Sequence, residues 1–148
     1  MNTEAMTILL AEDDAGHAQL IQRNLKRCGF TNEIVHVNDG REALDFVEAR
    51  GAFSNRRRHD PLLIILDIKM PAVDGIEVLK VLKAEPRTEK IPVIMLTTTD
   101  DPREVARCYE LGCNVYMSKP VAYEAFVEAI QRLGLFLQVV TLVREDEA

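Results

Sequence analysis

The feature that most constrains this chain is a run of five apolar residues, Leu62 to Leu66, with Pro61 in front and Pro71 and Gly75 behind. A short, fully apolar run bounded in this way predicts a strand buried on both faces, which is typical of the centre of a parallel sheet. Asp67 follows the run directly, so it should lie at the carboxyl end of the strand, where ligands bind in open α/β sheets. We therefore expect Asp67 to be a nucleophile.

The rest of the chain repeats a unit of one short strand followed by one amphipathic helix. Because such links are short and their crossovers right-handed, five units predict an α/β fold with helices on both faces of the sheet. The expected architecture is a doubly wound five-stranded parallel sheet in the flavodoxin-like order 2-1-3-4-5. Glu33 and His36 make the second strand more polar, which suits its place at an edge. The other predicted strands cover residues 7–11, 33–37, 91–96 and 114–117.

Apolar spacing predicts which side of each helix faces the sheet, because residues three and four apart share one face of a helix. We expect the inward residues to be Ala18, Ile21 and Leu25 in the first helix, Ile76, Leu79 and Leu82 in the third, Val105, Ala106 and Tyr109 in the fourth, and Phe126, Ile130, Leu133 and Leu137 in the last.

The length of 148 residues predicts a single domain, with its core at about residues 7–138. Residues 51–61 are polar and aperiodic, and they exceed the usual length of a link between a helix and a strand, so we expect an extended surface loop there. Residues 134–143 form an apolar C-terminal extension.

Charge and cysteine content narrow the class of partner. A formal charge of −6 and a pI near 5.1 argue against nucleic acid or an anionic membrane, since both require a basic surface. The three cysteines form no metal-binding pair, which favours a reducing compartment. We find no basic and apolar leader and no apolar run near the ~18 residues of a membrane span. We expect a cytoplasmic protein.

Polar side chains at four strand ends should meet at one edge of the sheet, because the strands are parallel. Three of them are the carboxylates of Glu12, Asp13 and Asp67, and Lys119 offsets one negative charge. Carboxylates about 5 Å apart repel by roughly 3 kcal/mol per pair at an effective dielectric constant near 20, so the cluster requires a cation. An all-oxygen site of this kind suits Mg²⁺. Mg²⁺ beside a carboxylate nucleophile, with the hydroxyl of Thr97 on the same rim, predicts phosphoryl transfer.

Short motifs surround these strand ends: Glu12-Asp13, Asp67 with Met70-Pro71 and Asp74-Gly75, Thr97, and Lys119-Pro120 with Tyr116 three residues earlier. Together they resemble the receiver domains of two-component response regulators, over about residues 7 to 138. The resemblance implies that a histidine kinase phosphorylates Asp67. It also implies that the protein promotes its own phosphorylation and dephosphorylation without being a classical enzyme.

The same resemblance assigns a role to each site residue. Asp13, Asp67 and the backbone carbonyl of Lys69 would bind Mg²⁺, and Glu12 would hold a metal-bound water. Thr97 and Lys119 would contact the phosphoryl oxygens. Thr97 and Tyr116 would rearrange together as the switch.

A narrower resemblance concerns the partner. The long loop at residues 51–61, the absence of an effector domain and the apolar C-terminal extension are similar to the stand-alone regulators of phytochrome histidine kinases. A phytochrome-type kinase is the partner that this implies.

Three other functions use part of the same pattern. A phosphatase of the haloacid-dehalogenase class needs a second acid two residues after its nucleophile, where this chain has Lys69. A pseudo-receiver that only binds proteins would lack part of the acidic, hydroxyl and lysine set. A flavodoxin-like carrier of flavin mononucleotide would need a phosphate-binding loop where this chain has three acids, residues 12–14.

Several polar residues outside the set have simpler interpretations. Asp14 should be a solvated acid that stabilises the start of the first helix. The arginines at 56–58 should lie in a solvated loop, because no aromatic residues interleave with them. The histidines at 17, 36 and 59 lack the spacing of metal ligands.

The C-terminal residues 133–143 carry more apolar side chains than one face of a helix can bury. An exposed apolar patch marks a contact surface, and two-fold homodimers are the commonest soluble assembly. We predict a homodimer through the last helix, the last strand and the tail, with residues 144–148 disordered. The alternative is that residues 139–143 fold back over their own domain.

Overall fold

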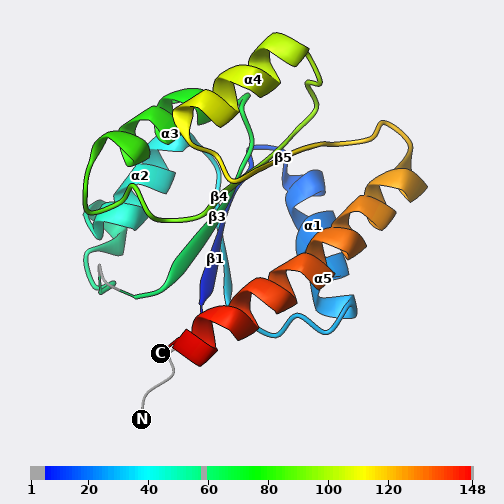
Figure 1. Cartoon of the computed structure of the whole chain (residues 1–148), viewed down its shortest axis with the longest axis horizontal. Coiled ribbons are helices and arrows are strands. Elements are labelled where there is room, and N and C mark those ends of the chain that lie inside the picture. The colour runs from blue at the N-terminus through cyan, green and yellow to red at the C-terminus, as the bar shows by residue number, and fades with distance from the viewer. Residues whose placement is uncertain (1–5, 58–59, 148) are drawn as a thin grey trace.

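The computed structural model describes residues 6–57 and 60–147, and for residues 140–147 it describes the backbone alone. One sheet of five parallel strands in the order β2-β1-β3-β4-β5 confirms the predicted α/β fold (Figure 1). The strands are β1 (Thr7–Ala11), β2 (Ile34–Val37), β3 (Leu62–Leu66), β4 (Val93–Thr97) and β5 (Val115–Ser118). The helices are α1 (Ala15–Arg27), α2 (Gly40–Glu48), α3 (Gly75–Ala84), α4 (Pro102–Leu111) and α5 (Tyr123–Glu147), with a short 3-10 helix at Gly51–Phe53.

Strand β3 forms the centre of the sheet, and all five of its residues are buried. Only Val37 of β2 is buried, which agrees with the polar sequence and edge position of that strand. Leu62–Leu66 is therefore the buried central strand that its apolar sequence predicts.

The helices cover both faces of the sheet. In Figure 1, α1 and α5 lie on one face, and α2, α3 and α4 lie on the other. The first face buries Ile21 and Leu25 of α1 against Phe126 and Ile130 of α5. On the other face, the apolar core is built from α2, α3 and α4 packed on the alternate side chains of β1, β3 and β4.

Aspartates begin four of the helices. The side chains of Asp14, Asp39, Asp74 and Asp101 each accept a hydrogen bond from a backbone N–H group in the first turn of α1, α2, α3 and α4 respectively. Such caps satisfy N–H groups that have no partner within the helix, and each typically contributes about 1 kcal/mol. The expected role of Asp14 at the start of the first helix is thus confirmed, in the sharper form of a cap.

The inward face of α4 differs from the prediction. Ala106 and Tyr109 are exposed, whereas Cys108 is buried, with Val105 and Leu111 half-buried beside it. The helix is rotated because Val105, Cys108 and Leu111, three residues apart, form the stripe that packs on the sheet. The hydroxyl of Tyr109 instead accepts a hydrogen bond from the backbone N–H of Tyr116, at 3.0 Å. In α3, Val78 is buried and the predicted Ile76 is only partly buried.

Helix α5 corrects the expectations for the tail. Its inward residues Phe126, Ile130, Leu133 and Leu137 are buried as predicted. Its helical backbone continues through Glu147, where the prediction had a disordered end at residues 144–148 and the alternative had residues 139–143 folding back; residue 148 lies outside the described residues. The predicted C-terminal extension is the second half of one helix.

Candidate functional site

Four parallel strands deliver the predicted site residues to one rim of the sheet. Glu12 and Asp13 follow β1, Asp67 follows β3, Thr97 ends β4, and Lys119 follows β5. Backbone hydrogen bonds continue the ladders past the strand ends: the N–H of Asp67 donates to Ala11 at 3.1 Å, and that of Lys119 donates to Thr97 at 2.6 Å. These bonds fix the backbone from which the functional side chains project.

The turn after Asp67 is closely packed at Gly75. The backbone N–H of Gly75 donates to the carbonyl of Ile68 at 2.8 Å. A Cβ atom on Gly75 would lie 2.0 Å from the carbonyl oxygen of Asp67, so only glycine fits there. Asp74 then caps α3. The Asp74-Gly75 motif therefore holds the segment that carries Asp67.

Lys119 joins the two buried acids of the rim. Its Nζ donates to Oδ2 of Asp67 at 3.0 Å and forms a second ion pair with Oε1 of Glu12. All three side chains are buried. Because a buried carboxylate is costly without a partner, the lysine is what allows Asp67 and Glu12 to lie side by side.

Glu12 is the acid most affected by burial. Loss of solvation raises its pKa to about 7, although the hydrogen bond and charge of Lys119 act in the opposite direction. Its second oxygen, Oε2, accepts a hydrogen bond from the backbone N–H of Asp14 at 3.1 Å. Burial therefore favours the protonated form of Glu12 more than it is favoured in a free side chain.

Three carboxylates converge in a way that fits a metal ion. One oxygen each from Glu12, Asp13 and Asp67 lies within 4.8 Å of the others. Asp13 is exposed and the other two are buried, so solvent reaches the cluster from the side of Asp13. With Lys119 the cluster carries −2, and its all-oxygen donors suit a hard divalent cation. The side chain of Lys69 is exposed two residues after Asp67, and the role of its carbonyl stays a prediction.

Thr97 has a fully buried hydroxyl that finds no hydrogen-bond partner among the described residues. Buried hydroxyls are nearly always paired, so an unpaired one at a predicted site suggests that a ligand supplies the partner. Its position on the rim is the one that the sequence predicts.

Tyr116 lies in β5 beside the end of β4. Its hydroxyl donates to the carbonyl of Thr99 at 2.7 Å, and burial raises its pKa to about 12. The ring is only partly buried and packs against the core under α4. Tyr116 is therefore held by the segment that follows Thr97, as a switch residue would be.

His17 is a residue of the rim that was not among the predicted site residues. This residue lies in the first turn of α1, and its Nδ1 is 3.2 Å from Nζ of Lys119. Its lack of metal-ligand spacing made it look unimportant. Its position in the sequence could have indicated the contact, because the first turn of the helix after Glu12 and Asp13 lies at the same rim.

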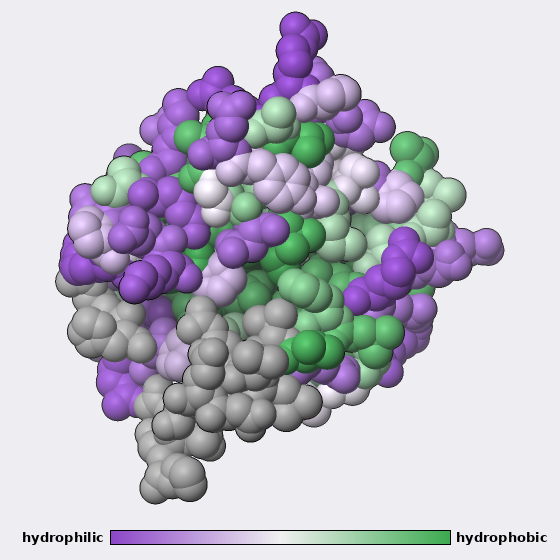
Figure 2. Space-filling model, in the orientation of Figure 1, coloured by the Kyte–Doolittle hydropathy of each residue, from purple (hydrophilic) through white to green (hydrophobic). Residues whose placement is uncertain are grey.

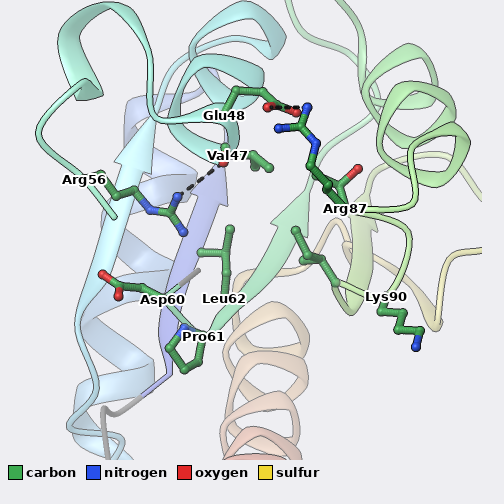
Figure 3. Close-up of a pocket in the computed structure, with 10 residues that line it drawn as sticks. Val47, Glu48, Arg56, Asp60, Pro61, Leu62, Arg87 and Lys90 are labelled. Carbon is green, nitrogen blue, oxygen red and sulfur yellow. Dashed lines mark hydrogen bonds and ion pairs between the residues drawn. The ribbon is translucent and has the colours of Figure 1, made fainter. Parts of the chain in front are cut away.

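A separate cavity lies at the opposite end of the sheet (Figure 3). It holds about 260 Å³ and is lined by Val47, Glu48, Arg56, Asp60, Pro61, Leu62, Arg87, Thr88, Lys90 and Ile91. Leu62 begins β3 and Asp67 follows its last residue, so the cavity is separate from the rim.

Arg56 belongs to the wall of this cavity. Its guanidinium donates to the carbonyl oxygens of Phe46 and Val47 at 3.1 and 3.3 Å and stacks on the Phe46 ring. Arg56 thus ties the predicted loop to α2, which corrects the expectation that it is simply solvated. Across the cavity, Arg87 pairs with Glu48 at 3.4 Å.

Comparisons with known proteins agree with this site. Residues 8–131 match the family described as the response regulator receiver domain. Response regulator Rcp1 of Synechocystis sp. is 36% identical over 136 residues, which cover 91% of each chain. The solved structure of Mn²⁺-bound Rcp1 has a TM-score of 0.83 at 34% identity and covers 88% of this chain and 93% of that chain.

Other solved structures give the same result. A receiver domain from Rhodospirillum rubrum is 47% identical, with a TM-score of 0.81 and coverage of 90% of this chain and 94% of that chain. The phosphorylated cyanobacterial phytochrome response regulator RcpA is 32% identical, with a TM-score of 0.81 and coverage of 88% and 91%.

Within the described residues, no helix is long and apolar enough to cross a membrane. The strand order, the rim of acids, threonine and lysine, and these matches lead to one conclusion: the chain belongs to the receiver domain family and is a response regulator of two-component signalling.

Proposed function

We propose that Asp67 is the residue that accepts the phosphoryl group from a histidine kinase, in a reaction that depends on Mg²⁺. The observation that carries this proposal is the ion pair between Lys119 and Asp67 inside a cluster of three carboxylates. Lys119 uses only Oδ2 of Asp67. The other carboxylate oxygen is left to attack phosphorus.

The surrounding residues prepare the site for the charge of the phosphoryl group. Lys119 is already desolvated and oriented toward the Asp67 carboxylate. It can therefore form an ion pair with a phosphoryl oxygen as negative charge develops there, without reorganising solvent. The unpaired hydroxyl of Thr97 can donate to another phosphoryl oxygen. Mg²⁺, when bound, supplies charge neutralisation for the transferred oxygens. Asp13, Asp67, the Lys69 carbonyl and, through water, Glu12 would hold it.

The test is labelling by acetyl phosphate, followed by the mass of the intact protein. We expect the wild-type protein to gain one phosphoryl group in Mg²⁺ and none in excess chelator, and Asp13→Ala to lose most of the labelling. Asp67→Asn should show none while keeping the circular dichroism spectrum of the folded protein. Full labelling in chelator would contradict the role of the metal, and full labelling of Asp67→Asn would contradict the role of Asp67.

The rival functions find less support in the same geometry. The position of a phosphatase general acid holds Lys69, an exposed lysine, and not a carboxylic acid. A pseudo-receiver would lack part of the set, whereas Glu12, Asp13, Asp67, Thr97 and Lys119 all reach the rim.

The proposed phosphoryl donor is a cytoplasmic histidine kinase of the phytochrome type. This rests on two relatives that are described as phytochrome response regulators, RcpA and the bacteriophytochrome regulator AtBRR, which is 42% identical with a TM-score of 0.72. Transfer from a purified, autophosphorylated phytochrome kinase should be much faster than from kinases with other sensors. Equal rates from unrelated kinases would contradict the assignment.

We also propose a homodimer through α5 and β5. Leu135, Phe136 and Val139 of α5 are 61%, 45% and 60% exposed, and β5 is an edge strand. Figure 2 shows hydrophobic surface gathered along α5. A second copy would cover this surface without leaving apolar side chains in water.

Sedimentation equilibrium at tens of micromolar protein, an order of magnitude set by weak dimers, tests this proposal. Phe136→Asp should give a folded monomer, whereas Arg41→Asp, at an exposed site of α2 on the other face of the sheet, should remain a dimer. A wild-type monomer at that concentration would contradict it.

A further inference from the structure

The ammonium group of Lys119 has a third partner besides the two acids. A lysine ammonium carries three N–H donors and no acceptor. In Lys119 they reach Glu12, Asp67 at 3.0 Å and Nδ1 of His17 at 3.2 Å. The Lys119 side chain is only 2% exposed, so these protein groups satisfy it in place of water.

The contact fixes the hydrogen on the His17 ring. Because the ammonium can only donate, Nδ1 of His17 must accept. The ring is therefore neutral in this arrangement and carries its hydrogen on Nε2. A protonated ring would have no acceptor and would place a second positive charge against Lys119.

Three parts of the chain hold the ring in place. The backbone N–H of His17 donates to Oδ1 of Asp14, the cap of α1, at 3.0 Å. Its Nδ1 is 3.7 Å from the other oxygen of Asp14, too far for a hydrogen bond. From α5, Phe126 packs against the ring edge to face, with centroids 5.4 Å apart and an interplanar angle of 89°. The charged groups near His17 are thus Asp14 on its own helix and Lys119 across the rim.

We propose that His17 is a positioning residue for Lys119, and that its neutral ring sets how fast Asp67 gains a phosphoryl group. This inference rests on the proposed role of Asp67. With only two carboxylate partners, the ammonium could shift away from Asp67 toward Glu12. The third contact, from a ring fixed on α1 and α5, holds the ammonium within reach of Asp67.

The first experiment compares variants of His17 in phosphorylation by acetyl phosphate. His17→Phe keeps a ring against Phe126 but removes the acceptor, and His17→Asn keeps an acceptor at the position of Nδ1. We expect His17→Phe to lower the maximal rate by roughly ten- to a hundredfold, the range that one hydrogen bond from a charged donor is worth, with little change in half-saturation. His17→Asn should recover most of the rate. Gln19→Ala, an exposed site on the same helix, should match the wild type.

Equal rates for His17→Phe and the wild type would overturn the inference. Equally slow His17→Asn and His17→Phe would also overturn it, because they would indicate a packing role for the ring. Thermal unfolding of each variant shows whether it is folded. If the wild-type protein is not labelled on Asp67, the proposed function fails, and the contact between His17 and Lys119 is then tested by the spectra of the His17 ring.

A second measurement does not depend on phosphorylation. The ¹⁵N chemical shifts of the neutral His17 ring report which nitrogen carries hydrogen. We expect hydrogen on Nε2 in the wild type, and a shift of the ring signals when Lys119→Ala removes the donor. Hydrogen on Nδ1 in the wild type would contradict the inference.

Discussion

Thr97 and Tyr116 lie on the same face of the sheet, on neighbouring strands. Thr97 pairs with the residue two positions after Tyr116, and alternate residues of a strand share a face. Thr97 holds a buried hydroxyl without a described partner, and the hydroxyl of Tyr116 is bound to the carbonyl of Thr99. If Thr97 moves toward a phosphoryl group, the backbone that anchors Tyr116 moves with it. We therefore predict that the two residues rearrange together as a switch.

Thr97→Ala should leave phosphorylation of Asp67 largely intact and disconnect it from Tyr116. The reason is that Lys119 and the acids do not depend on the threonine hydroxyl, whereas Tyr116 responds through Thr97 and Thr99. The ring signals of Tyr116 in NMR spectra, recorded before and after addition of beryllofluoride and Mg²⁺, measure the response. We expect a change in the wild type and in Thr97→Ser, and none in Thr97→Ala. A full response in Thr97→Ala would contradict the coupling.

Metal binding should weaken as the pH falls through about 7, because burial raises the pKa of Glu12 to about that value. A protonated Glu12 lowers the negative charge of the cluster, so Mg²⁺ must displace its proton. Calorimetric titration in buffers of different ionisation enthalpy should show proton release near pH 6.5 and almost none near pH 8.5. Glu12→Gln should bind Mg²⁺ more weakly at pH 8.5 and lose the dependence on pH. Proton release that persists in Glu12→Gln would assign it to another group.

The same pKa has a consequence for the metal-free protein. In the folded state the pKa of Glu12 is about 7, whereas the ordinary pKa of a free glutamate side chain is 4.5. Between these values the folded state binds more protons, so the contribution of Glu12 to the free energy of unfolding falls as the pH rises through that window. The loss is at most about 3 kcal/mol. Urea unfolding in chelator gives the free energy of unfolding at pH 5 and at pH 8. The difference between these two values should be smaller for Glu12→Gln than for the wild type. An equal difference in both proteins would contradict the raised pKa of Glu12.

Gly75→Ala should destabilise the protein by several kcal/mol or prevent folding, because its Cβ would lie 2.0 Å from the carbonyl oxygen of Asp67. Gly16→Ala is the matched control. Its Cβ would meet only a side-chain oxygen of Asp14, at 3.3 Å, and alanine favours a helix. Urea unfolding should separate the two by a large margin. Similar stability for both variants would show that the turn after Asp67 is free to move.

Much of the fold and the rim could be predicted because strand ends carry a strong signal. A fully apolar run that stops at a carboxylate, as at Leu66 and Asp67, leaves little freedom in where the strand ends. Parallel strands then bring Glu12, Thr97 and Lys119 to the same edge. Each of these positions follows from the order of elements along the chain.

Other features depend on packing between elements, which one sequence does not encode locally. Cys108 faces the core in place of Tyr109 because the stripe of Val105, Cys108 and Leu111 packs on the sheet, and the Tyr109 hydroxyl accepts a hydrogen bond from the backbone of Tyr116. The contact between His17 and Lys119 joins residues that are 102 positions apart in the sequence. It depends on how α1 and β5 lie relative to each other in the fold. Arg56 binds the end of α2 for the same reason.

The most direct test of the central claim is the position of the acyl phosphate itself. The labelled protein can be reduced with borohydride, which converts a phosphoaspartate to homoserine, and the modified residue can then be located by peptide mass spectrometry. We predict homoserine at position 67 and nowhere else, only in samples labelled in the presence of Mg²⁺. Homoserine at position 13 or 74, with Asp67 unchanged, would contradict the assignment of Asp67 as the phosphoryl acceptor.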